Sequence, residues 1–212
     1  MGVIENLKSF NRKERFYLIG LALDNRDFKL GQGFREALST KLHINVPDNP
    51  FCAMDYHVDW IYASLALALP NRNEGPYRRP SKRPSKEELS FTQEDVDLLV
   101  AFEDNAGQCH IIMIEAKGDT NWLNRQLASK AKRLNATFDS DGRRWTGVTP
   151  HFVILSPRAP QKLKTDGFPE WLLTDGAPRW IPLSNMPHGL RQVTRCDSKG
   201  RQSEGGEFWK AE

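Results

Sequence analysis

Three residues in the middle of the chain have types and spacing suited to hydrolytic chemistry. Asp97 lies within one apolar run, and Glu115 and Lys117 end a second apolar run two residues apart. Side chains at positions i and i+2 of a strand share a face, so we expect Glu115 and Lys117 to point the same way. What these residues could do together depends on how the two runs pair.

The segment between the two runs predicts this pairing. Residues 104–108 contain Asp, Asn and Gly, which are typical of a turn, so residues 96–102 and 111–114 are expected to form an antiparallel hairpin. A five-residue loop pairs Glu103 with Cys109, and the residue numbers of every further pair also add up to 212. Asp97 then lies opposite Glu115, with the side chains about 5 Å apart. Carboxylates at that distance repel, which predicts a cation between them.

The cation that fits this prediction is Mg²⁺ or Mn²⁺. The two carboxylates and the backbone carbonyl of Ala116 are hard oxygen ligands, which Mg²⁺ prefers. Lys117 could orient an attacking water molecule or stabilise negative charge on a phosphate. A metal ion, a lysine and a water molecule are suited to phosphodiester hydrolysis. The simpler alternative is an ordinary cross-strand ion pair at an exposed strand end.

The motif resembles the active site of the PD-(D/E)xK nuclease superfamily, the fold of many restriction enzymes. The run Asp97-Leu98-Leu99-Val100 precedes Glu115-Ala116-Lys117, with Glu115 18 residues after Asp97, and Val96 stands where the proline of the family name would be. The resemblance covers about residues 95–157 and implies an αβββαβ core with the acidic residue and the E-x-K triplet on adjacent strands.

The same resemblance implies roles for individual residues. Asp97 and Glu115 would bind the metal, Lys117 would be the catalytic lysine, and Gln126 in the following helix would be an auxiliary active-site residue. Many nucleases of this type place one more carboxylate near the metal from a preceding helix. Asp59 is the first candidate for that ligand and Glu36 is the second, although a helix cap or an exposed charge explains either residue.

Two basic segments could contact nucleic acid. The predicted helix 121–136 carries four basic residues and no acid, with Gln126, Lys130 and Arg133 on one stripe, and the proline-rich segment 71–90 is expected to be a mobile loop. A solvated helix face and a soluble linker are the alternatives. The residues expected to contact phosphates are Arg125, Lys130 and Arg133 of the helix and Arg78, Arg79, Lys82 and Arg83 of the loop.

The remaining pattern predicts the elements around this hairpin. Helices are expected within residues 3–24, with a break near Asn11, and over 34–42. For residues 59–69 alternation suits a strand, but the Ala and Leu content favours a helix. Residues 151–155 should form a strand, with His110 and His151 as core or rim residues. Residues 191–196 and 207–210 should form a peripheral hairpin on which Trp209 packs.

These elements together predict one α/β domain over residues 1–212. Its mixed sheet would be flanked by helices, with a core at about 34–157, N-terminal helices and a C-terminal hairpin extension at about 179–212. We expect a metal-dependent nuclease, with DNA the favoured substrate, and a homodimer is an open possibility. The alternatives are a nucleic-acid-binding protein that keeps the fold without cleaving, and an α/β interaction protein without a nucleic-acid partner.

Composition limits the class of protein. The chain has 212 residues, a formal net charge of +3 and six Trp, which excludes a wholly disordered chain. Its longest apolar stretch is shorter than the roughly 20 residues that cross a bilayer, and its start lacks a signal-peptide pattern. Three widely spaced cysteines indicate neither a disulfide framework nor a zinc site. A cytoplasmic location is therefore expected.

Overall fold

The computed structural model describes most of the chain. The described residues are 2–10, 14–26, 28–68, 94–118, 124–161, 163–183, 191 and 193–212, with the backbone alone for 14–17 and 124–125. The predicted basic loop at 71–90 lies outside the described residues. Within them, no helix is both long enough and apolar enough to cross a membrane.

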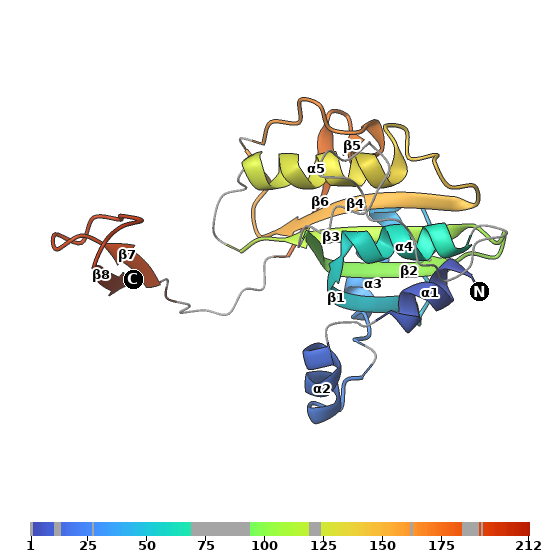
Figure 1. Cartoon of the computed structure of the whole chain (residues 1–212), viewed down its shortest axis with the longest axis horizontal. Helices are drawn as coiled ribbons and strands as arrows, with labels where there is room; N and C mark the ends of the chain where they lie inside the picture. Colours follow the sequence, from blue (N-terminus) through green and yellow to red (C-terminus); the bar gives the residue numbers. More distant parts are fainter. Residues whose placement is uncertain are drawn as a thin grey trace.

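A mixed six-stranded sheet forms the centre of the molecule, in the order β1-β2-β3-β4-β6-β5 (Figure 1). Strands β1, β2 and β3 pair antiparallel, β3 and β4 pair parallel, and β4 pairs parallel with β6. The six strands are β1 (Phe51–His57), β2 (Asp95–Glu103), β3 (Cys109–Ala116), β4 (Val148–Ser156), β5 (Leu173–Thr174) and β6 (Ala177–Pro182).

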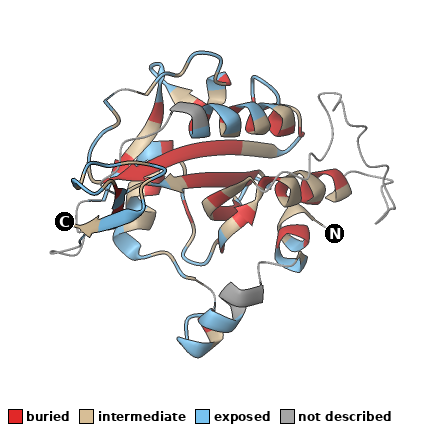
Figure 2. Ribbon diagram, turned by 60° about the vertical axis from the view of Figure 1, so that its left-hand side comes forward, coloured by how far each residue is buried: buried red, intermediate tan, exposed pale blue. Residues whose placement is uncertain are grey.

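Helices cover both faces of this sheet and create two buried clusters. Leu7, Ile61 and Leu134 belong to the cluster on the face covered by α1, α4 and α5, and Leu38 and Leu42 bring α3 into the cluster on the opposite face. Helices cover β3 and β4 on both faces, and both strands are mostly apolar and buried along most of their length (Figure 2). The helices are α1 (Val3–Ser9), α2 (Glu14–Ala22), α3 (Gln32–Leu42), α4 (Val58–Ala68), α5 (Asn124–Phe138) and the single 3₁₀ turn η1 (Glu170–Leu172).

The hairpin of β2 and β3 has the predicted register. Glu103 pairs with Cys109, and the pairing continues to Leu98 and Ile114. The turn is held by Asp104, whose Oδ1 accepts hydrogen bonds from the backbone N–H groups of Ala106 and Gln108 at 2.8 and 2.9 Å. A carboxylate that caps its own turn in this way fixes the loop length and therefore the register of the strands.

Several other predicted elements are confirmed. The N-terminal segment forms α1 and α2, the segment 34–42 lies within α3, and the ambiguous segment 59–69 forms α4 rather than a strand. Helix α5 follows β3, and β4 contains the strand expected at 151–155. The α/β class with a mixed sheet flanked by helices is thus confirmed.

Three expectations are wrong in detail. Strand β1 was not expected, because residues 51–57 show no regular alternation of apolar and polar residues. Asp55 has a positive φ of 46°, and residues 51–53 before it are all buried, whereas Tyr56 is the only buried residue among 54–57. Residues 179–182 belong to β6 of the central sheet instead of the C-terminal extension, so the core reaches beyond residue 157. The extension does form a hairpin, β7 (Val193–Cys196) with β8 (Phe208–Ala211), but Trp209 is 72% exposed and does not pack on it.

Candidate functional site

The ends of β2 and β3 bring Asp97 and Glu115 next to each other. Their strands are paired up to Leu98 and Ile114, one residue before the acidic positions. Oδ2 of Asp97 accepts a hydrogen bond of 2.6 Å from the backbone N–H of Ala116. The N–H and C=O groups of one strand residue point to the same side, so the carbonyl of Ala116 also faces β2. Oxygen atoms of two carboxylates and one backbone carbonyl, all able to bind a cation, therefore lie at this strand end.

Glu115 is a partly buried carboxylate with neighbours of both signs. Its side chain is 12% exposed, it forms an ion pair with Lys130 of α5, and it accepts a hydrogen bond from the backbone N–H of Asp97. Burial raises the pKa of Glu115 to about 7; the negative charge of Asp97 also raises it, and Lys130 opposes the shift. The ionised form of such a partly buried carboxylate is stabilised by any positive charge that approaches it.

Lys117 and Gln126 meet at the same end of the sheet. The ammonium Nζ of Lys117 donates a hydrogen bond of 3.4 Å to Oε1 of Gln126, which lies in the first turn of α5. The backbone N–H of Lys117 donates to the carbonyl of Leu155 at 2.8 Å and so attaches the end of β3 to β4. The structure therefore brings together Asp97, Glu115, Lys117 and Gln126, the four residues predicted to be catalytic.

The basic stripe of α5 faces carboxylates of the chain itself. Leu127, Ala131 and Leu134 are buried and set the orientation of the helix, because they follow the spacing i, i+4, i+7. The neighbouring stripe then points Lys130 at Glu115 and Arg133 at Asp59.

Both ion pairs are largely shielded from solvent. The side chains of Lys130 and Glu115 are each 12% exposed, and those of Arg133 and Asp59 are each 13% exposed. Asp59 lies in the first turn of α4, and its carboxylate forms its ion pair with Arg133. The sequence contained a signal for this pairing, since a helix with four bases and no acid follows directly after an acidic strand end.

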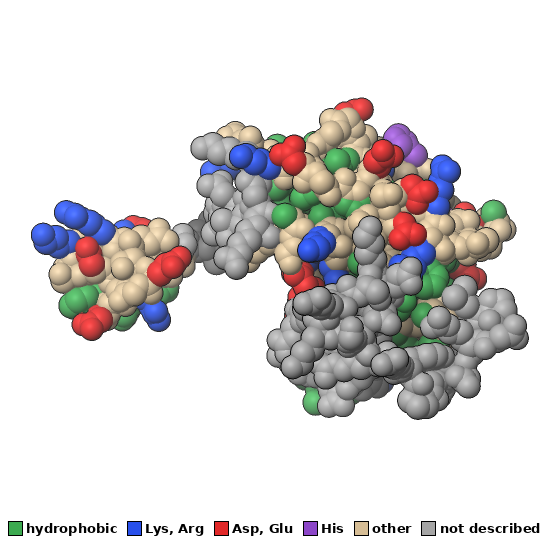
Figure 3. All heavy atoms as spheres, turned by 45° about the horizontal axis from the view of Figure 1, so that its top comes forward, with side chains coloured by type: hydrophobic (Ala, Val, Ile, Leu, Met, Phe, Trp, Pro, Cys, Tyr) green, Lys and Arg blue, Asp and Glu red, His purple; other side chains and the backbone are tan. Residues whose placement is uncertain are grey.

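The other predicted residues lie elsewhere or are not described. Glu36 is exposed on α3, where it accepts a hydrogen bond of 2.9 Å from Gln32 within the same helix, and α3 covers the opposite face of the sheet. The side chain of Arg125 lies outside the described residues, as do Arg78, Arg79, Lys82 and Arg83. On the face shown in Figure 3, basic and acidic side chains are interspersed.

Two contacts that sequence reasoning missed connect the same region. The hydroxyl of Ser129 in α5 donates to Oε1 of Glu94 at 2.7 Å, and Nζ of Lys130 donates to the backbone carbonyl of Asp95 at 2.5 Å. Asp95 is the first residue of β2, and Glu94 directly precedes it. Helix α5 is therefore attached to β2 as well as to β3, so it cannot shift without disturbing the acidic pair.

The donor set is compatible with a small divalent cation. Mg²⁺ takes oxygen ligands and usually keeps several waters, so two carboxylates and one carbonyl can be enough protein ligands. Asp97, Glu115 and Ala116 supply these oxygens. Across the described part of the chain, no three His, Cys, Asp or Glu side chains form a group that could hold a metal ion. A fully protein-ligated metal centre among those residues is therefore not supported.

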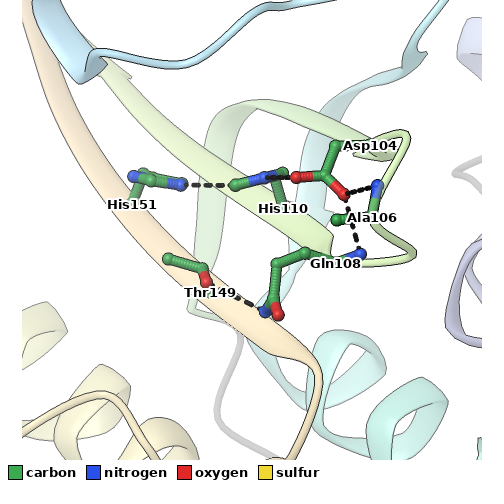
Figure 4. Close-up of polar contacts among 6 residues, drawn as sticks. All are labelled: Asp104, Ala106, Gln108, His110, Thr149 and His151. Carbon is green, nitrogen blue, oxygen red and sulfur yellow. Dashed lines mark hydrogen bonds and ion pairs between the residues drawn. The ribbon is translucent and has the colours of Figure 1, made fainter.

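A second polar cluster lies at the opposite end of β3 and contains His110 and His151 (Figure 4). Nε2 of His110 is 3.2 Å from Oδ2 of Asp104, and Nδ1 of His110 is 3.0 Å from Nε2 of His151. The pKa of Asp104 is lowered, mainly by its hydrogen bond from the backbone of Gln108 and then by His110, so the carboxylate is ionised and can only accept. Nδ1 of His110 and Nε2 of His151 share a single hydrogen, so one ring donates this hydrogen bond and the other accepts it.

Burial keeps His151 neutral. Both histidines are 7% exposed, which confirms them as core residues. Burial lowers the pKa of His151 to about 3, with further lowering from His110 and Arg179. This cluster joins the turn, β3 and β4, and we assign it a structural role.

Comparisons with known proteins identify no relative. A scan against protein-family models, a search of curated proteins and a search of solved structures each found no match for this chain. The case for a function therefore depends on the residues and the geometry described above.

Proposed function

We propose that this protein is a metal-dependent nuclease that hydrolyses phosphodiester bonds in DNA. The observation that carries the proposal is the meeting of Asp97 and Glu115 at the ends of adjacent antiparallel strands, with Lys117 two residues further on and in contact with Gln126. Strand β2, the end of β3 and the first turn of α5 supply these residues.

The order of elements supports the finer fold assignment. The series α3, β1, β2, β3, α5, β4 follows the αβββαβ order that the resemblance to PD-(D/E)xK nucleases implies, with α4 inserted between β1 and β2. The antiparallel pairing of β1, β2 and β3 also places the acidic residue and the E-x-K triplet on neighbouring strands. We therefore propose a restriction-endonuclease-like core for this chain.

Each residue of the site has a role in this proposal. Asp97, Glu115 and the carbonyl of Ala116 would hold Mg²⁺ or Mn²⁺, which lowers the pKa of bound water and offsets negative charge on a phosphate. The ammonium of Lys117 orients the attacking water and stabilises the charge that develops on the scissile phosphate. Gln126 holds Lys117 in position through the hydrogen bond between Oε1 and Nζ.

One observation favours a second candidate, a nucleic-acid-binding protein that keeps this fold without cleaving. Lys130 and Arg133 already neutralise Glu115 and Asp59, so the acidic residues have positive partners within the chain. Such a protein would bind DNA in a salt-dependent manner and show no metal-dependent turnover.

A cleavage assay distinguishes the two candidates. Purified wild-type protein is incubated with supercoiled DNA, linear DNA and RNA in the presence of Mg²⁺, Mn²⁺ or a chelator. We expect cleavage of DNA that requires the metal, and a loss of at least about 100-fold in Lys117→Ala, because one transition-state contact typically supplies that much.

Lys132→Ala is the matched control, since Lys132 is an exposed lysine on α5. This variant should cleave at the wild-type rate. Equal cleavage by wild type and Lys117→Ala would remove Lys117 from the mechanism. Binding of DNA without any metal-dependent cleavage would instead support the non-catalytic candidate.

A further inference from the structure

Lys130 is held against the candidate metal ligand Glu115 from two sides. Its ammonium pairs with Oε1 of Glu115 and donates a hydrogen bond of 2.5 Å to the backbone carbonyl of Asp95. Both Lys130 and Glu115 have side chains that are 12% exposed. The next residue, Ala131, is buried in the core and fixes this part of α5. The ammonium is therefore placed by the fold and is not a freely moving surface charge.

An ammonium at this position and a divalent cation need the same carboxylate. Asp97 and Glu115 carry two negative charges when both are ionised, and Lys130 offsets one of them. A divalent ion bound to Glu115 would bring two more positive charges beside Lys130, and the two cations would repel each other. Binding of the metal therefore requires the ion pair between Lys130 and Glu115 to be weakened or broken.

We propose that Lys130 is an internal competitor for Glu115 and that it lowers the affinity of the acidic pair for divalent cations. Lys130 acts through Glu115, so it is a positioning residue that tunes the site and is not a catalytic residue. This inference rests on the proposed metal-dependent function and adds a specific determinant of metal affinity to it.

The test is a titration of the full chain with Mn²⁺ by isothermal calorimetry. Lys130→Met keeps much of the length of the side chain without its charge, and we expect it to bind Mn²⁺ roughly tenfold more tightly than wild type, as a partly buried charge pair is commonly worth that factor. Lys130→Gln should bind more tightly too, while it can still donate hydrogen bonds. Lys130→Arg keeps the charge and should bind as weakly as wild type.

Two further variants complete the design. Lys132→Met removes an exposed charge from the same helix and should change the affinity less than twofold, which separates competition at Glu115 from a general effect of net charge. Glu115→Gln should abolish binding, because it removes the ligand itself. The shift in the thermal unfolding temperature of each variant on addition of Mn²⁺ gives a second measurement if Lys130→Met is less stable.

The outcomes distinguish failure of this inference from failure of the proposed function. If Mn²⁺ binds through Glu115 but Lys130→Met and Lys130→Gln bind it no more tightly than wild type, Lys130 is not a competitor and only this inference is overturned. If neither wild type nor any Lys130 variant binds Mn²⁺, the metal site itself is wrong and both proposals fall.

Discussion

The groups around Glu115 shift its pKa in opposite directions. Burial and the charge of Asp97 favour the protonated acid, whereas the ammonium of Lys130 favours the carboxylate. Burial is the largest of these effects and raises the pKa to about 7. The residue types and the register place Asp97 and Glu115 together. They do not predict the pKa of Glu115, because this pKa also depends on Lys130, which α5 places over the strand end.

The raised pKa of Glu115 predicts how stability depends on pH. Between its ordinary pKa of 4.5 and about 7, folded Glu115 keeps a proton that the unfolded chain has released. The free energy of unfolding therefore includes a contribution that is fully present below pH 4.5 and is lost as the pH rises through about 7, with a slope of at most about 1.4 kcal/mol per pH unit. Urea denaturation in the presence of a chelator, at pH 5 and pH 8, measures it.

Glu115→Gln should lack this contribution, so its stability should fall less than that of wild type between the two pH values. Glu36→Gln is the matched control, since Glu36 is exposed on α3 and outside the site. Wild type and Glu115→Gln with the same pH dependence would contradict the assigned state of this carboxylate.

Polar contacts between elements hold the two ends of the central sheet in different ways. At the acidic end, Lys130 joins α5 to β3 and Arg133 joins α5 to α4. At the other end, His110 and His151 join β3 to β4, and Asp104 joins His110 to the turn of the hairpin. The sequence predicted the stripe on α5 correctly, but the direction in which the stripe points is a property of helix packing.

The histidine pair predicts a pH effect of opposite sign. The pKa of His151 is lowered from 6.5 to about 3, so the unfolded chain binds a proton in this range that the folded chain does not. The stability that neutral His151 contributes is present above pH 6.5 and is lost as the pH falls toward 3. His151→Gln should therefore lose less stability than wild type between pH 6.5 and pH 4.5 in urea denaturation.

His43→Gln serves as the control for this experiment, because His43 is an exposed histidine at the end of α3. It should follow the wild-type pH dependence. A wild-type slope in His151→Gln would show that His151 does not carry the effect.

The whole molecule consists of a central sheet with two clusters and a separate small hairpin. Among the described residues, both clusters take their members from positions 3–181, and none of them comes from β7 or β8. The sequence indicated the hairpin but placed its boundary too early, since β6 belongs to the central sheet. Residues 177–182 are a short segment whose place is decided by parallel pairing with β4, far away in the chain.

This division predicts that the chain folds without its hairpin. A protein that ends at Leu183 retains β6 and both clusters, so we expect a single cooperative unfolding transition within a few degrees of the full chain, as the cores that determine the enthalpy are intact. Thermal unfolding followed by circular dichroism is the measurement. A protein that ends at Gly176 loses β6 with buried Ile181 and should be much less stable. Loss of folding in the longer of the two proteins would show that the hairpin belongs to the core.

Local interactions explain what the sequence determined by itself. The turn at Asp104 and the strand pattern around it were enough to predict the register that brings Asp97 next to Glu115, because a hairpin is set by neighbours along the chain. Tertiary structure decided which cation meets Glu115, where β1 and β6 pair, and that Lys130 and Arg133 of α5 face carboxylates of the chain. These features depend on packing between segments that are distant in sequence, so the pattern within any one segment does not fix them.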